Sequence, residues 1–246
     1  MSNTKYTYAV ARIRALEVSL FSDAVIEQLL ACRTADEALR FVMEKGWGDV
    51  SGDADMDAVL KREEEKTWEV IRDVAPDMKV FDVLSYPKLY HNLKAAVKEA
   101  CTEKQTPGIF YDDCDIPGGE MLRIIENREF SRLPGNMGRV AEEALDTLLH
   151  TRDGQLCDVM IDKAALEAIY EAGKRSGEPI IENYADTTVA IADIKIAVRS
   201  RKTGKSGDFM RSAMAECRSV NAEQLIRAAL SGEEEIARYL EGTSYA

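Results

Sequence analysis

The chain has 246 residues, of which 46% are apolar and 31% are charged, and its formal net charge at pH 7 is -12. Phosphate binding needs a surplus of lysine and arginine, so the excess of 44 acidic over 32 basic side chains argues against nucleic acid as the main partner. No stretch approaches the roughly 18 apolar residues of a membrane span, and the first residues lack the apolar core of a secretory signal. The composition predicts a cytoplasmic protein.

The cysteine pattern agrees with that compartment. The five cysteines are scattered and odd in number, and no two of them are spaced as C-x-x-C. A disulfide framework shows regular, paired spacings instead. The sequence therefore predicts free thiols, most of them buried as small hydrophobes: Cys32, Cys101, Cys114, Cys157 and Cys217.

The first part of the chain predicts helices, because residues 1–75 contain no proline. Apolar positions recur at steps of three, four and seven, which predicts a helix with one buried stripe: Tyr6, Val10, Ile13 and Leu20. Breaks are expected at residues 45–49 and 52–57. The helix expected over residues 60–72 carries a dense charge run, which favours a solvated face with i,i+4 pairing over a binding stripe.

Two more helical stripes are expected further along the chain. The longest polar break is expected at 104–119, where the strand-like segment 108–111 is predicted to be loop, and another break is expected at 175–179. The fold class is therefore all-α. The two stripes are Leu89, Leu93, Ala96, Val97 and Ala100, and Tyr184, Ile191, Ile194 and Val198.

Self-comparison of the sequence reveals a repeat. The motif at 27–32 (EQLLAC) returns at 120–125 (EMLRII) and at 223–228 (EQLIRA), each time after residues that suit a helix start. A second acidic and apolar segment follows each copy: residues 36–39, 141–145 and 233–236.

A second element recurs at 91–98 (HNLKAAVK) and 192–199 (ADIKIAVR), with a weaker copy at 11–15. In each copy an apolar residue of the expected buried stripe is followed at once by a cation. We interpret these cations as core-edge residues that extend their charged ends toward water, rather than as partner contacts: Arg12, Arg14, Lys94 and Lys195.

The two repeated elements predict a domain organisation. Residues 1–21 form an N-terminal helix, 22–115 a first helical repeat, 116–218 a second, and 219–246 the start of a third. The third copy stops before its long helix. Because a helical unit needs neighbours to cover its apolar face, we expect that this long helix is missing and that the third repeat is truncated.

Residues 204–206 (GKS) resemble the end of a phosphate-binding loop. That motif needs another glycine five positions before Gly204, where the backbone approaches phosphate, and the residue there is Arg199. The preceding segment is expected to be a helix rather than a strand. A phosphate site is therefore not predicted.

An acidic run imitates the ligand spacing of a calcium loop through Asp53, Asp55, Asp57 and Glu64. The position that needs glycine for the sharp turn is Ala58, and a helix is already expected to be under way there. Acidic side chains that interact with a helix dipole explain the cluster more simply than a calcium site.

Other candidates for chemistry are equally weak. His91 and His150 are about 60 positions apart and follow no metal-ligand spacing. The acidic loop 112–115 is interpreted as solvated, and Cys32 and Cys217 lie within helical patterns that favour inert burial. The sequence predicts no catalytic residue, no cofactor site and no metal site.

Residues 6–17 (YTYAVARIRALE) resemble the start of the C subunit of the V/A-type rotary ATPases, the family of the d subunit of eukaryotic V-ATPases. The resemblance covers essentially the whole chain and is densest over residues 6–100. It continues through a charged helix that ends near Trp68 and through the segments 27–30, 35–39, 46–49, 90–94, 192–195 and 223–225.

The resemblance implies three similar helical subdomains around a pseudo-threefold axis, forming a funnel-shaped socket. It implies a non-catalytic part without cofactors, which couples the membrane rotor ring to the central stalk during ATP-linked proton or sodium transport. Such a protein would lie at the cytoplasmic face of the membrane, attached only through the complex. Family members are longer and end with another long helix, which puts the third subdomain of this chain in doubt.

Two other classes remain open. A cytosolic helical-repeat adaptor is the main alternative, although tetratricopeptide and HEAT units are shorter than the repeat of about 90–100 residues expected here. An all-α enzyme with its site hidden in a cleft between helices is the third.

Overall fold

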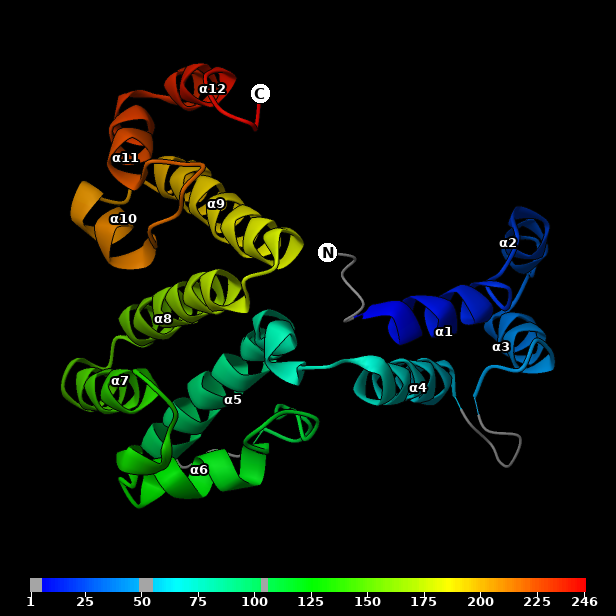
Figure 1. Cartoon of the computed structure of the whole chain (residues 1–246). Coiled ribbons are helices and arrows are strands. Elements are labelled where there is room, and N and C mark those ends of the chain that lie inside the picture. Colours follow the sequence, from blue (N-terminus) through cyan, green and yellow to red (C-terminus); the bar gives the residue numbers. More distant parts are fainter. Residues whose placement is uncertain (1–5, 49–54, 103–105) are drawn as a thin grey trace. The chain divides into compact units, whose positions relative to one another are not determined.

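The computed structural model describes residues 6–48, 55–102 and 106–246, in two compact units that are Met1–Met78 and Lys79–Ala246. Every regular element of the described residues is helical, which confirms the predicted all-α class (Figure 1). No helix among these residues combines the length and the apolarity that crossing a membrane requires. The finer division into repeats, with boundaries near residues 22, 116 and 219, stays a prediction.

The described residues of the first unit form four α-helices, two of which begin at side-chain caps. Thr34 Oγ1 accepts a hydrogen bond from Glu37 N (3.2 Å), and Asp55 Oδ1 accepts one from Ala58 N (2.8 Å). Such caps satisfy backbone donors that have no partner inside the helix. The helices are α1 (Thr7–Glu17), α2 (Asp23–Leu30), α3 (Ala35–Glu44) and α4 (Met56–Val74).

The turn after α3 is fastened to α4. Gly48 N donates to Glu63 Oε1 (2.8 Å), and Lys66 Nζ donates to Gly48 O (2.9 Å). Gly48 has φ +76, and a Cβ at this position would lie 3.2 Å from Val59, so both the backbone conformation and the space favour glycine. The charge run of α4 therefore does more than face solvent, because two of its side chains hold this turn.

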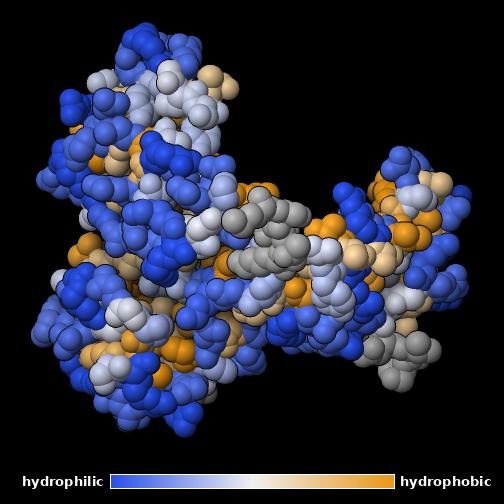
Figure 2. Space-filling view, viewed as in Figure 1, coloured by the Kyte–Doolittle hydropathy of each residue, from blue (hydrophilic) through white to orange (hydrophobic). Residues whose placement is uncertain are grey.

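The predicted buried stripe of α1 is wrong. The helix forms, but 56% of Val10, 40% of Ile13 and 72% of Leu20 are exposed. Figure 2 shows apolar residues at the surface of this unit. The main partner of α1 is α4, and among the described residues of the unit Val42 and Val59 are the only buried apolar side chains, so there are too few neighbours to cover the stripe.

The second unit begins with a four-helix group around one core. The stripe predicted for residues 89–100 is confirmed, because Leu89, Leu93, Ala96 and Val97 are at most 1% exposed and Ala100 packs at the edge. After η2 (Met78–Phe81), which spans the boundary between the units in the sequence, the elements are α5 (Asp82–Thr102), α6 (Gly118–Glu126), η3 (Phe130–Arg132), α7 (Met137–Thr151) and α8 (Gly154–Ser176).

A second core lies among the last four helices, around Met210, Leu225, Ile226 and Ile236. The break expected at 175–179 is present, because α8 ends at Gly177 with φ +65 and α9 begins at Pro179. These helices are α9 (Pro179–Lys202), α10 (Gly207–Ala213), α11 (Ala222–Ser231) and α12 (Glu233–Glu241).

A smaller cluster joins the two cores through α5, α8 and α9. Val83, Ile169, Ala172 and Ala185 are buried together there. A Cβ at Gly173 would lie 2.3 Å from the Cβ of Ala185, so glycine is what lets α8 and α9 approach so closely. The second unit therefore packs as one continuous body.

Short and long helices recur along the chain, whereas the repeat itself stays a prediction. Two short helices and two long ones run from α2 to α5, and again from α6 to α9, before α11 and α12 begin another short pair. The three copies of the first motif lie in α2, α6 and α11, and the segments that follow them lie in α3, α7 and α12. The threefold symmetry itself stays a prediction.

The third predicted stripe is wrong in part. Ile194 and Val198 pack against the second core, but 45% of Tyr184 and 39% of Ile191 are exposed. The buried face of α9 instead consists of small and polar residues that let neighbouring segments approach the helix: Ala185, Asp186, Val189, Ala190, Asp193, Ala197 and Ser200.

Candidate interaction sites

A buried asparagine on α5 holds the segment that precedes α6. Asn92 is fully buried, and its Nδ2 donates to Tyr111 O (2.7 Å) and Ile116 O (3.3 Å) while its Oδ1 accepts from Tyr111 N (2.9 Å). His91 assists, since its Nε2 lies 2.8 Å from Ile109 O. These contacts explain why the strand-like segment 108–111 is loop, as expected: its polar groups bond to α5 rather than to a sheet.

Two buried aspartates on α9 hold the segment that precedes α11 in a similar way. Asp193 Oδ1 accepts from Ala215 N (3.2 Å), and Asp186 Oδ1 accepts from Arg218 N (2.7 Å) and Ser219 N (3.3 Å). Asp193 is fully buried, and its Oδ2 has no hydrogen-bond partner among the described residues. Burial raises the pKa of its carboxyl to about 7, against a smaller lowering by the Ala215 hydrogen bond and by Lys163.

The segments that imitate binding motifs have structural roles. Lys205 of the GKS segment donates to Gln155 Oε1 (2.7 Å), and the segment follows a helix, unlike a true phosphate-binding loop. In the calcium-like run, Asp55 caps α4 and Asp57 lies in its first turn, while Asp53 lies outside the described residues. In the part of the chain that the structure describes, no three ligand-type side chains lie close enough to hold a metal.

The predicted burial of the thiols is mostly wrong. Cys157 is buried, and burial raises its pKa to about 11, but the other four cysteines are partly exposed. Cys32 follows the end of α2, and Cys217 lies between α10 and α11, so neither belongs to a helix. The expectation that both lie within helical patterns is therefore wrong.

Several of the charged residues singled out from the sequence form ion pairs within the chain. Lys94 pairs with Asp162 at the edge of the first core, and Arg14 pairs with Glu17 on α1. In the acidic loop, Asp113 pairs with Lys88. These pairs are partly exposed, so each contributes little to stability.

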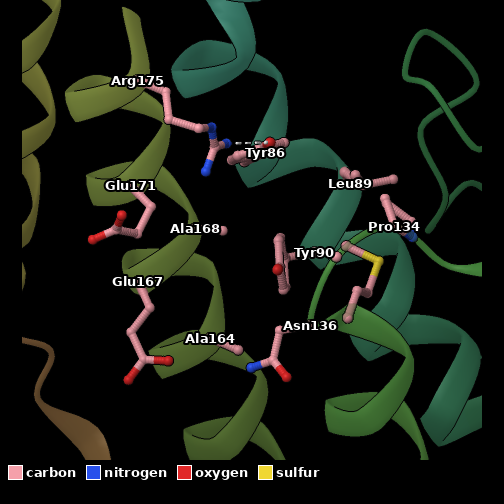
Figure 3. A pocket seen from close by; sticks show the side chains of 12 residues that line it. Tyr86, Leu89, Tyr90, Pro134, Asn136, Ala164, Glu167, Ala168, Glu171 and Arg175 are labelled. Atoms are coloured by element: carbon pink, nitrogen blue, oxygen red, sulfur yellow. Dashed lines mark hydrogen bonds between the residues drawn. The ribbon is translucent and has the colours of Figure 1, made fainter.

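One cavity of about 320 Å³ lies between α5, the start of α7 and α8. Figure 3 shows the ring of Tyr90 facing Ala164 and Ala168 of α8, with Arg175 reaching the Tyr86 hydroxyl at 3.5 Å. Burial is the main cause that raises the pKa of Tyr86, and it raises the pKa of Tyr90 to about 12. Both phenols stay protonated at neutral pH, and the Tyr86 oxygen accepts the hydrogen bond from Arg175 Nη2.

A second cavity of about 370 Å³ lies between α8, α9 and the region of α10. Its walls are more apolar, and its charged lining residues are Asp162, Arg199 and Lys205. The two cavities bring together residues that are far apart in the sequence, such as Tyr86 and Arg175 in the first, so no local spacing could have identified them.

The structure defines an all-α protein in which short and long helices recur, with cavities of about 320 and 370 Å³ between its helices. Residues 9–246 match the family model of the ATP synthase (C/AC39) subunit, so the chain belongs to this family. The family named from the sequence resemblance is confirmed.

Two curated relatives are similar along most of the chain. One is the C subunit of the V-type sodium ATPase of Enterococcus hirae, 20% identical over 87% of this chain and 66% of the relative. The other is the C subunit of the A-type ATP synthase of Methanocaldococcus jannaschii, 20% identical over 98% of this chain and 66% of the relative. The chain thus spans about two thirds of the length of the relatives that it matches.

Proposed function

We propose that this chain is a non-catalytic central-stalk subunit of a rotary V/A-type ATPase, which couples the membrane rotor ring to the central shaft. The observation that carries the proposal is the family match over residues 9–246. The two relatives are named as the C subunits of a sodium ATPase and of an ATP synthase, so the proposed transported ion is a proton or sodium.

The packing suits a part that transmits torque. Close-packed helices resist deformation and pass strain from one end to the other. In the second unit, two cores and the cluster that joins them form a continuous body from α5 to α12. A mechanical part needs such rigidity and broad contact surfaces, and it needs no reactive group.

We extend the proposal to the place of the protein in the complex. Its partners are the rotor ring and the other central-stalk subunits, and it attaches to the cytoplasmic face of the membrane through them. The three repeats would surround a pseudo-threefold axis as a socket for the stalk. The recurring order of short and long helices supports this arrangement.

Affinity purification of the tagged native protein from solubilised membranes of its source organism tests the proposal. We expect rotor-ring and central-stalk subunits of a rotary ATPase to co-purify, as identified by mass spectrometry, and to be absent from an untagged strain. Recovery of unrelated soluble proteins without ATPase subunits would contradict the proposal and favour the helical-repeat adaptor.

A further inference from the structure

The cavity between α8, α9 and α10 has apolar walls, part of which belong to no core. Its volume of about 370 Å³ falls within the range of about 300–1,000 Å³ typical of small-molecule sites. Val159, Leu166 and Phe209 line it and are partly exposed, and among the described residues none of the three is part of a hydrophobic core. An apolar occupant would remove this surface from water.

Two cations flank the apolar walls. Lys205 Nζ lies 2.7 Å from Gln155 Oε1 and 4.9 Å from the centre of the Phe209 ring. Arg199 lines the cavity from α9. Within residues 6–48, 55–102 and 106–246, neither Arg199 nor Lys205 has a carboxylate at ion-pair distance. Both charges can therefore receive an anion.

Other cations of this region differ from Arg199 and Lys205, because they form ion pairs. Nearby, Lys202 pairs with Glu233 (3.4 Å), and Arg211 pairs with Glu223 (2.9 Å). The acidic residue of the cavity lining, Asp162, is already paired with Lys94. The cavity is thus locally positive in a chain whose net charge is -12, which favours an anionic ligand over a cationic one.

We propose that this cavity binds a small amphiphilic anion, which carries a carboxylate on an unbranched apolar chain. The carboxylate accepts charge-assisted hydrogen bonds from Arg199 and Lys205. The apolar chain packs against Val159, Leu166 and Phe209, and each methylene group adds to the affinity. The cavity has one cationic end and an otherwise apolar lining. This division matches a ligand with one anionic headgroup and one apolar tail.

Isothermal titration of the whole chain at pH 7.5 tests the proposal, with decanoate kept below its micelle-forming concentration. We expect saturable binding at one site. Decanol has the tail without the charge and should bind about tenfold more weakly, because it cannot form the charge-assisted hydrogen bonds. Acetate has the charge without the tail and should show no measurable binding.

Variants locate the site. Arg199→Gln and Lys205→Gln should each weaken decanoate binding by about tenfold, and Val159→Phe should abolish it by filling the cavity. Lys195→Gln, on the exposed side of the same helix and outside the cavity lining, should leave binding unchanged. Circular dichroism and thermal unfolding verify that each variant is folded.

Three results would overturn the proposal. One is the absence of saturable decanoate binding to the folded chain. Another is binding that the Arg199 and Lys205 variants leave intact, or that Lys195→Gln weakens equally. The third is binding of an acidic amphipathic peptide by this cavity without binding of decanoate, which would assign the cavity to a protein partner.

Discussion

At pH 8, the Asp193→Asn variant should have a free energy of unfolding about 2–4 kcal/mol higher than that of the native chain. Asp193 is fully buried, and in the part of the chain that the structure describes one of its carboxylate oxygens has no hydrogen-bond partner. Burial raises its pKa from 3.8 to about 7, so the native chain must hold a poorly solvated charge at pH 8. An amide has nearly the same shape and carries no charge.

The stabilisation should depend on pH in a defined direction. Below pH 4 the Asp193 carboxyl is neutral in the folded and the unfolded chain, so burial brings no penalty from charge. Between pH 4 and about 7 the unfolded chain releases this proton first, so the native stability falls as the pH rises through the window. Above about pH 7 the carboxyl is ionised in the folded and the unfolded chain, so the loss of stability caused by burying its charge no longer changes with pH. The advantage of the variant should therefore shrink to less than half by pH 5.

Other titratable groups also face Asp193. Lys163 of α8 donates to Arg211 O (3.0 Å) and lowers the pKa of Asp193, while Cys217 is close enough to interact electrostatically with both Asp193 and Asp186. The difference in the free energy of unfolding between the variant and the native chain separates the contribution of Asp193 from the contributions of these neighbouring groups. Denaturant unfolding followed by circular dichroism from pH 5 to pH 8 measures it.

Asp186→Asn is the matched control for this prediction. Asp186 accepts two backbone hydrogen bonds, from Arg218 N and Ser219 N, so neutralising it weakens charge-assisted bonds and should not stabilise the chain. A pH-independent difference for Asp193→Asn, or a destabilised variant at pH 8, would contradict the account of the buried carboxyl.

The reverse exchange, Asn92→Asp, should destabilise the chain by about 3–5 kcal/mol at pH 7. The amide nitrogen of Asn92 donates to the carbonyl oxygens of Tyr111 and Ile116. A carboxylate in its place would set oxygen against oxygen in a buried site and leave both carbonyls without their donor. We expect the segment 109–116 to detach from α5.

Denaturant unfolding at pH 7 measures this effect, and increased amide hydrogen exchange over residues 109–116 locates it. Asn183→Asp is the control, since Asn183 is exposed on α9 and its Oδ1 accepts from Arg218 Nη2 (2.8 Å). That change should stay within about 0.5 kcal/mol of the native chain. Equal stability of Asn92→Asp and native chain would show that Asn92 does not hold the segment.

Periodicity predicted the helices well because helix formation depends on local sequence. The stripe around Leu93 was predicted correctly since α6, α7 and α8 all cover it. The stripe around Ile13 was not buried, because a pattern of apolar residues cannot say how many neighbours will cover a helix. The sequence did not predict the buried polar face of α9. Asp186 and Asp193 are buried because they accept hydrogen bonds from the backbone of the segment before α11, which is distant in the sequence.

Self-alignment carried more information about the candidate sites than motif spacing did. It placed Asn92 opposite Asp193, and both side chains hold the segment before the next short helix. The cavity near Lys205 could not be predicted in this way. Its lining comes from α8, α9 and α10, and only packing brings Gln155 and Lys205 together.

The coupling of ATP hydrolysis to ion transport tests the proposed central-stalk role most directly. We would measure both in membrane vesicles of the source organism, with and without the gene for this protein. We predict that deletion abolishes ATP-driven ion accumulation and that expression of the native gene restores it. Ion accumulation that continues unchanged at the same rate per ATP hydrolysed would contradict a coupling role for this protein.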